Sequence, residues 1–123
     1  MIKGMRLASI WSEDLNNLLP FYRDIVGLPV GLDTPGFVVL GESHEPALAL
    51  GTHSELHGPA AEPARHTVAF ETDDIEAEFA RLKEQGVEFV EEPTAPGDTG
   101  VRVATFKDPE GNLIQLLQFT VPM

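Results

Sequence analysis

Histidines at positions 44, 53, 57 and 66 are the side chains of this chain best suited to bind a metal ion or transfer a proton. His53 and His57 lie four residues apart, which is the spacing at which a helix presents two ligands to one ion. Glycine and proline recur through residues 52–64, however, so no helix is expected there and both histidines are interpreted as solvated loop residues. His44 lies in another polar loop and carries no comparable signal.

An aromatic side chain near the N-terminus suggests a different chemistry, the stacking of a planar ligand. Residues 5–11 alternate as a strand does, so Leu7, Ser9 and Trp11 share one of its faces. An indole on an open sheet face is a platform for a planar or cationic molecule. Packing of the same Trp11 in a core or a dimer interface is the alternative interpretation.

Polar candidates follow in the second half of the chain. Thr67 and Glu71 share one face of a strand predicted over residues 65–72. There Glu71 is a candidate to pair with a ligand cation or to act as a base, and a plain charge at a strand end is the alternative. Arg102 begins a later strand, where it either binds a carboxylate or neutralises nearby acids.

Composition limits the classes of partner. The chain has 123 residues, with 8 Lys and Arg against 20 Asp and Glu, for a net charge of −12. This charge argues against nucleic acid and anionic lipid as partners, and it is compatible with a cationic ligand. The absence of cysteine excludes disulfides and thiolate chemistry. No apolar run approaches the ~18 residues of a membrane span and no secretion signal is recognisable, so we expect a cytoplasmic protein.

Periodicity predicts two helices and eight strands. Apolar residues at helical spacing predict one helix over residues 15–26, in which Pro20 should produce a kink or an irregular turn. A second helix is predicted between the capping Asp74 and Gly86. Strands are predicted over residues 5–11, 28–33, 37–40, 47–50, 65–72, 87–90, 101–106 and 113–119.

The same order of elements therefore occurs twice, as an internal repeat. The capping Asp14 and Asp74 are about 60 positions apart, as are the helix-ending Gly27 and Gly86. One domain over residues 1–123 is divided into a first βαβββ module at 1–51, a linker at 52–64 and a second module at 65–123. The predicted fold class is α+β. The two modules would form a cup-shaped mixed sheet with helices outside, because a single module leaves one sheet face uncovered.

Three stretches carry a family pattern. They are Glu-Asp-Leu at 13–15 with Phe-Tyr-Arg-Asp-Ile-Val-Gly-Leu at 21–28, Thr-Val-Ala-Phe-Glu-Thr-Asp-Asp-Ile at 67–75 with Leu82 and Gly-Val at 86–87, and Gly-Val-Arg at 100–102 with Phe-Lys-Asp-Pro-Glu-Gly-Asn-Leu-Ile-Gln-Leu at 106–116. In them the chain resembles the vicinal oxygen chelate superfamily, which includes glyoxalase I, extradiol dioxygenases, and the fosfomycin and bleomycin resistance proteins. The resemblance implies a glyoxalase-like fold and a homodimer, but these motifs identify a scaffold rather than a chemistry.

The resemblance also implies four positions for the ligands of a divalent metal, which the family takes from the first and last strands of each half. Here they fall on Leu7, Thr67, Gln115 and one of residues 48–50. This set offers at best one weak amide ligand, whereas an open catalytic site needs about three protein ligands. No metal is therefore favoured. The alternative is a strand register shifted by one residue, which would turn His66 into the cup with Gln115.

The favoured hypothesis is a binding protein, as the resemblance to bleomycin resistance proteins implies, with a small hydrophobic or cationic molecule held in a metal-free cavity. The candidate ligand-binding residues are Leu7, Ser9, Trp11, Thr67, Glu71, Arg102 and Gln115. The alternative is a metal-dependent lyase, isomerase or dioxygenase that uses His66, Gln115 and Glu71. A metal-free enzyme with Glu71 or a loop histidine as its base also stays open, so the sequence leaves the ligand and any catalysis undecided.

Overall fold

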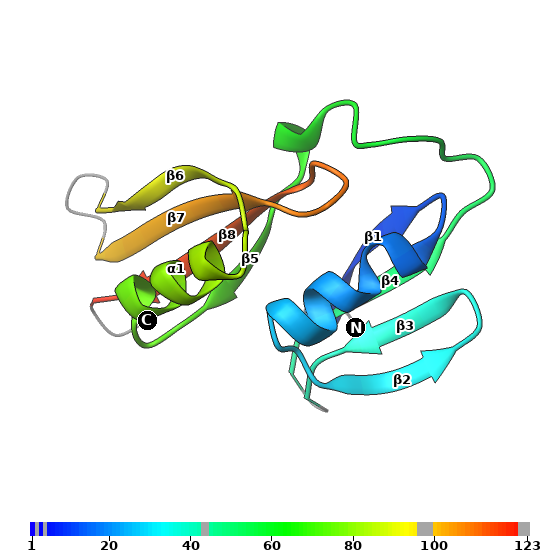
Figure 1. Cartoon of the computed structure of the whole chain (residues 1–123). Coiled ribbons are helices and arrows are strands. Elements are labelled where there is room, and N and C mark those ends of the chain that lie inside the picture. The colour runs from blue at the N-terminus through cyan, green and yellow to red at the C-terminus, as the bar shows by residue number, and fades with distance from the viewer. Residues whose placement is uncertain (2, 4, 43–44, 96–99, 121–123) are drawn as a thin grey trace. The chain divides into compact units, whose positions relative to one another are not determined.

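The chain folds into two compact units in a computed structural model that describes residues 1, 3, 5–42, 45–95 and 100–120. The units are Met1–Gly58 and Pro59–Met123 (Figure 1). Each contains one four-stranded mixed sheet and few helical residues. This arrangement confirms the α+β class and the repeated order of strand, helix and three strands. No helix among the described residues is long and apolar enough to cross a membrane.

In the first unit the strands lie in the order β1-β4-β3-β2. The strands are β1 (Leu7–Ser12), β2 (Val30–Thr34), β3 (Phe37–Leu40) and β4 (Ala47–Thr52). The first and last strands run parallel, and the other two pairs are antiparallel. Leu40 and Leu50 are almost fully buried on the face that also packs against the helical segment.

That helical segment corrects the prediction of one helix over residues 15–26. It consists of a 3-10 turn, η1 (Leu15–Asn17), and a π-helical turn, η2 (Phe21–Ile25). Pro20 has no N–H to continue a ladder, and Val26 N–H donates to the Phe21 carbonyl five residues back at 2.9 Å. The predicted apolar stripe is nevertheless buried, because Leu18 and Tyr22 are both 0 % exposed.

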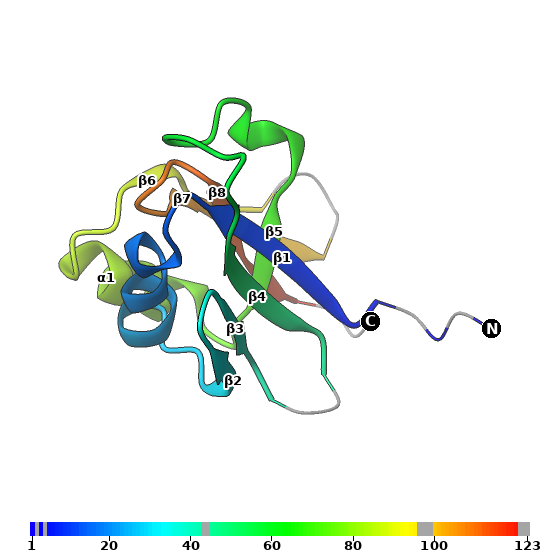
Figure 2. The same cartoon turned by 90° about the vertical axis from the view of Figure 1, so that its right-hand side faces the viewer.

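The second unit repeats this topology with the strand order β5-β8-β7-β6. Its elements are η3 (Pro63–Arg65), β5 (Val68–Glu71), α1 (Ile75–Glu84), β6 (Phe89–Thr94), β7 (Val101–Lys107) and β8 (Leu113–Phe119). Strand β5 runs parallel to β8, while β6, β7 and β8 pair antiparallel. Helix α1 lies against one face of this sheet (Figure 2).

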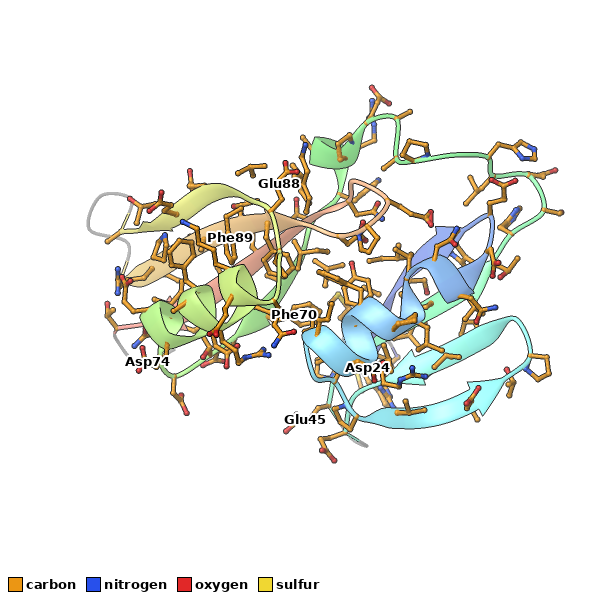
Figure 3. All side chains as sticks on the ribbon, in the orientation of Figure 1. Asp24, Glu45, Phe70, Asp74, Glu88 and Phe89 are labelled. Carbon is orange, nitrogen blue, oxygen red and sulfur yellow. The ribbon has the colours of Figure 1, made fainter. Side chains whose placement is uncertain are left out.

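Helix α1 begins at a specific cap and packs on the sheet through aromatic side chains. The Asp74 carboxylate accepts from Ala77 N–H at 3.1 Å, as a capping residue should. Phe89, labelled in Figure 3, packs its ring 4.7 Å from that of Phe79 on the helix and 5.4 Å from that of Phe106 on β7. These aromatic contacts tie the helix to the sheet.

Several strands begin later than their apolar patterns predict. Val30 and Phe89 begin β2 and β6, two residues after the predicted starts. The reason lies at the preceding helix ends, where Gly27 and Gly86 have φ of 91° and 90°. The next N–H groups turn back to the helix, from Leu28 to the Tyr22 carbonyl and from Val87 to the Leu82 carbonyl, at 3.0 Å each. Strand β5 also starts late, at Val68, because Pro63 begins the 3-10 turn η3.

The predicted turn after β7 is held by one carboxylate. Asp108 is 5 % exposed, and its Oδ1 accepts from the backbone N–H groups of Glu110 and Asn112 at 2.9 Å each. The Asn112 amide donates to the Oδ2 atom at 2.8 Å. The Asp-Pro-Glu-Gly motif therefore has a structural role in closing the β7–β8 hairpin.

Candidate functional site

The open face of the first sheet carries the predicted stacking residues. Leu7, Ser9 and Trp11 are exposed on β1, and Leu7 and Trp11 expose 39 % and 44 % of their surface. Ala8 and Ile10 alternate with them and point the other way, since they pair with Leu48 and Leu50 of the face that packs against the helical segment. The structure therefore brings all three candidates of β1 together on one face, opposite the helical segment.

Trp11 lies against bare backbone. It pairs with Gly51 of β4, and a Cβ atom added to Gly51 would lie 2.3 Å from the indole Cζ3. The Phe37 ring on β3 lies 6.0 Å from Trp11 with the planes tilted by 31°, and the His53 ring lies 6.0 Å away nearly perpendicular, at 84°. We call Trp11, Phe37 and His53 the aromatic platform. Glycine at position 51 is what allows the indole to lie flat over the sheet.

Of the platform residues, Phe37 is absent from the sequence-based candidates, and His53 is among them only as a loop histidine and not as a neighbour of Trp11. Phe37 joins Trp11 because both pair with Gly51, which is a matter of sheet register. His53 follows β4 directly, and its N–H donates to the Ser12 carbonyl at 2.9 Å, which fixes it at the end of β1. The pairing of β4 with β1 on one side and with β3 on the other is the signal that points to these contacts.

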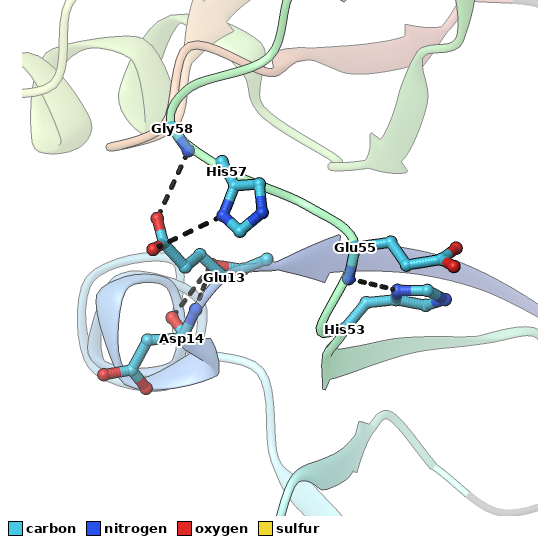
Figure 4. A network of polar contacts seen from close by, with 7 residues as sticks. Glu13, Asp14, His53, Glu55, His57 and Gly58 are labelled. Carbon is cyan, nitrogen blue, oxygen red and sulfur yellow. Dashed lines mark hydrogen bonds and ion pairs between the residues drawn. The ribbon is translucent and has the colours of Figure 1, made fainter.

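The two loop histidines contact different partners, as Figure 4 shows. His53 Nδ1 accepts from the Glu55 N–H at 3.1 Å. The Glu13 carboxylate accepts from Gly58 N–H at 3.3 Å and lies 3.8 Å from His57 Nδ1. Their spacing therefore does not bring the two imidazoles to one point. His44 lies outside the described residues.

The open face of the second sheet is more polar. Glu71 is exposed on β5, and Gln115 on β8 is the cross-strand partner of Ala69, so both share the face away from α1. Thr67, just before β5, is exposed and follows the same alternation. His66, one residue earlier, is also exposed. By the alternation of the strand, Thr67 lies on the same face as Glu71 and His66 does not.

Arg102 lies on the opposite face of this sheet. Its cross-strand partner is Gln118, whose side-chain oxygen accepts from Ile75 N–H at the start of α1. The Arg102 guanidinium forms an ion pair with Glu76 of the same helix. The structure thus separates Arg102 from Gln115 and Glu71 and engages it in fixing the helix.

Sheet register identifies the fourth position that the family uses for a metal ligand. Ala49 pairs with Ser9 as Gln115 pairs with Ala69, so Ala49 is the first-unit counterpart of Gln115. With Leu7 and Thr67, the four positions supply one amide and one hydroxyl. No group of three or more His, Cys, Asp or Glu side chains suited to a metal occurs within the described parts of the chain. This donor set does not fit a divalent ion, which needs about three protein ligands.

A separate hollow of about 580 Å³ lies on the helix side of the first sheet. Its lining includes Leu15 and Leu19 of the helical segment, and Asp33 and Gly36 around the β2–β3 turn. The charge of Asp33 also acts on Arg23 of the helical segment.

On that exposed surface Arg23 donates two hydrogen bonds to Asp24, at 2.8 and 2.9 Å. These bonds lower the pKa of the Asp24 carboxyl. The pKa of Arg23 is raised, first by its hydrogen bonds and charge contact with Asp24 and also by the charge of Asp33. The pair is a surface feature on the side of the unit away from the aromatic platform.

Comparisons with known proteins place this geometry in a family. A relative from Bacillus subtilis (strain 168), the uncharacterized protein YurT, is 32% identical over 128 residues, covering 91% of this chain and 96% of its own length. TnmS3, an antibiotic binding protein from Streptomyces sp. CB03234, has a TM-score of 0.76 and 29% identity, over 96% of this chain and 97% of its own.

A superfamily member from Sphaerobacter thermophilus DSM 20745 is similar to the same degree, with a TM-score of 0.76 and 26% identity over 95% of this chain and 98% of its own. The model of one family matches residues 5–116, which is most of the sequence. The resemblance inferred from the three motif stretches is thereby confirmed: the chain belongs to the Glyoxalase/Bleomycin resistance protein/Dioxygenase superfamily.

Proposed function

We propose that this protein binds a small planar aromatic molecule, preferably a cation, on the aromatic platform and without a resident metal ion. The observation that carries the proposal is Trp11, which is 44 % exposed although it lies over Gly51 and beside Phe37. An aromatic side chain of this size is normally buried unless its face has a partner. A flat, pre-positioned indole loses little entropy when a ring stacks on it.

Charge favours a cationic form of the ligand. The net charge of −12 attracts positive solutes, and an indole face binds cations through its quadrupole. On the second unit, we propose Thr67, Glu71 and Gln115 as polar contacts for a small molecule on that unit's own open face. Arg102 is omitted from this set because its guanidinium already pairs with Glu76.

One structural neighbour favours a binding role over a particular reaction. Members of the superfamily bind small molecules, often use a divalent metal and often form dimers, and TnmS3 is described as an antibiotic binding protein. The four family metal positions of this chain offer too few donors for that metal. We propose a homodimer by the same resemblance.

The single tryptophan makes the test specific, because intrinsic fluorescence reports on the platform alone. Titration with N-methylacridinium or with bleomycin should quench Trp11 saturably, and calorimetry should give the same affinity with chelator present. Trp11→Ala should weaken calorimetric binding by about tenfold, the equivalent of one stacking contact of roughly 1.4 kcal/mol.

Val90→Ala is the matched control, since Val90 is an exposed apolar residue on β6 with 49 % of its surface accessible. That variant should bind as the unaltered protein does. Equal affinity of the Trp11→Ala variant would contradict the platform. A selective rise in melting temperature with one of Mn, Co, Ni, Zn or Fe(II) would contradict the metal-free part of the proposal.

A further inference from the structure

His53 contacts the aromatic platform through a geometry that depends on its protonation state. Its backbone is fixed by the hydrogen bond to the Ser12 carbonyl, and its ring stands edge-on to Trp11 at 6.0 Å. The Nδ1 atom accepts a hydrogen bond from the Glu55 N–H at 3.1 Å (Figure 4). An imidazole nitrogen that accepts carries no proton, so this arrangement belongs to the neutral ring.

Protonation changes this corner in two ways. The Nδ1 atom becomes a donor, so the Glu55 N–H loses its partner and the loop loses one restraint. A positive charge also arises on a ring whose centroid lies 6.0 Å from that of Trp11, close to where a stacked ligand would carry its own charge. While His53 is neutral, the platform can stack a cationic ligand. Once His53 is protonated, the platform carries a positive charge of its own.

We propose that His53 is a pH-dependent specificity residue of the platform: it permits cationic aromatic ligands while neutral and disfavours them once protonated. The proposal rests on the proposed function, because it concerns the same ligand. Neutral aromatic ligands feel no such repulsion. The platform therefore selects ligands by charge to a degree that depends on the pH around the protein.

Few other charges approach this corner among the described residues. The rings on its sheet side, Trp11 and Phe37, are uncharged. Glu55 lies two residues along the loop, and Glu13 is engaged by Gly58 N–H and His57 at the far end of the same segment. His57 is thus the second imidazole of that segment, and it provides the matched control.

The first arm of the test needs no ligand. Trp11 fluorescence of the full chain is recorded from pH 8 to pH 5, the range in which an ordinary imidazole becomes charged. A protonated imidazole beside an indole quenches it, so the unaltered protein should show one step. That step should disappear in His53→Gln and persist in His57→Gln. Far-UV circular dichroism verifies that both variants fold.

The second arm compares two ligands of similar shape, the permanently cationic N-methylacridinium and neutral acridone. Between pH 8 and pH 5.5 the affinity for N-methylacridinium should fall about three- to tenfold, which is the repulsion expected of two charges some 6 Å apart in a largely aqueous setting. The affinity for acridone should change less than twofold, and both affinities should be flat in His53→Gln.

The results test three statements separately: the contact between His53 and Trp11, the selection of ligands by charge, and the proposed function. A fluorescence step that survives in His53→Gln overturns the contact between His53 and Trp11. An equal fall for acridone, or the same fall in His53→Gln, overturns the selection by charge. Absence of N-methylacridinium binding at every pH overturns the proposed function and the affinity claim, whereas the fluorescence step is judged independently of either ligand.

Discussion

The two modules share one device for anchoring their helices and use different residues for it. In the first, Leu15 N–H donates to the Thr52 hydroxyl of β4 at 3.0 Å. In the second, Ile75 N–H donates to the Gln118 side chain of β8 at 2.9 Å. Both helix starts are thus satisfied by a side chain at the end of the module's last strand. The two modules therefore repeat the same hydrogen bond although the residues that form it differ.

The open faces of the two sheets differ much more than the anchors. Trp11 corresponds to Glu71, and Leu7 corresponds to Thr67, by their places on β1 and before β5. The first face is aromatic and apolar and the second is polar. A face that is not needed for the module's own core is free to differ in chemistry while the strands behind it keep their pairing.

The helix sides differ at one point. Arg102 pairs across strands with Gln118 and forms an ion pair with Glu76. Gly36 occupies the corresponding place in the first module, where its carbonyl accepts from Thr52 N–H at 3.0 Å and φ is 78°. The first module has its hollow at that turn. The second module therefore has the Arg102 guanidinium at the position where the first module has an open hollow beside Gly36.

The largest expected effect comes from Gly51→Ala. This substitution disturbs the packing of Trp11 on Gly51, which is the feature that most distinguishes the two open faces. The new methyl would overlap the indole of Trp11, with 2.3 Å between Cβ and Cζ3. We expect the free energy of unfolding to fall by about 1–3 kcal/mol, as for other overpacked sites. The emission maximum of Trp11 should shift to the red as the ring is displaced into water.

Urea denaturation measures the first quantity and a fluorescence spectrum the second. Leu117→Ala is the control, because Leu117 holds the same place in the second module, beside Glu71. It should leave the Trp11 emission maximum where it is. An unchanged maximum in Gly51→Ala would mean that the indole does not depend on the bare backbone beneath it.

A smaller effect is expected from removing the capping carboxylates, and it should differ between the two helix starts. Asp74 caps a regular helix of ten residues, so Asp74→Ala should lower the free energy of unfolding by about 1 kcal/mol. Asp14 caps only a three-residue 3-10 turn through Asn16 N–H, and Ser12 Oγ also bonds at that corner. We expect Asp14→Ala to cost about half as much. Equal losses in parallel urea titrations would show that the broken helix depends on its cap as strongly as the regular one.

Local patterns predicted the scaffold well, because alternation and capping act over a few residues. Leu7, Ser9 and Trp11 do share an exposed face, and Asp14 and Asp74 do cap. An irregular turn at Pro20 was predicted, but its π-helical form was not, because periodicity reports buried positions rather than the hydrogen-bond ladder.

The candidate site needed information from pairing between strands. Alternation gives Arg102 two possible faces, and only its pairing with Gln118 decides for the helix side. The contact of His53 with Trp11 depends on the end of β4 lying beside the end of β1. Such contacts join residues far apart in the chain, so a one-residue error in register removes them.

The smallest expected effect concerns the ion pair that the first module lacks. The side chains of Arg102 and Glu76 are 31 % and 59 % exposed, so water and salt screen their attraction. Arg102→Gln and Glu76→Gln should each lower the free energy of unfolding by less than about 1 kcal/mol, and a double-mutant cycle should give a coupling that shrinks from 0.05 to roughly 0.5 M salt. The first module folds over a hollow at the same place, so the topology does not require this pair. A coupling well above that limit, and insensitive to salt, would instead mean that α1 needs an electrostatic anchor that the broken helix of the first module does without.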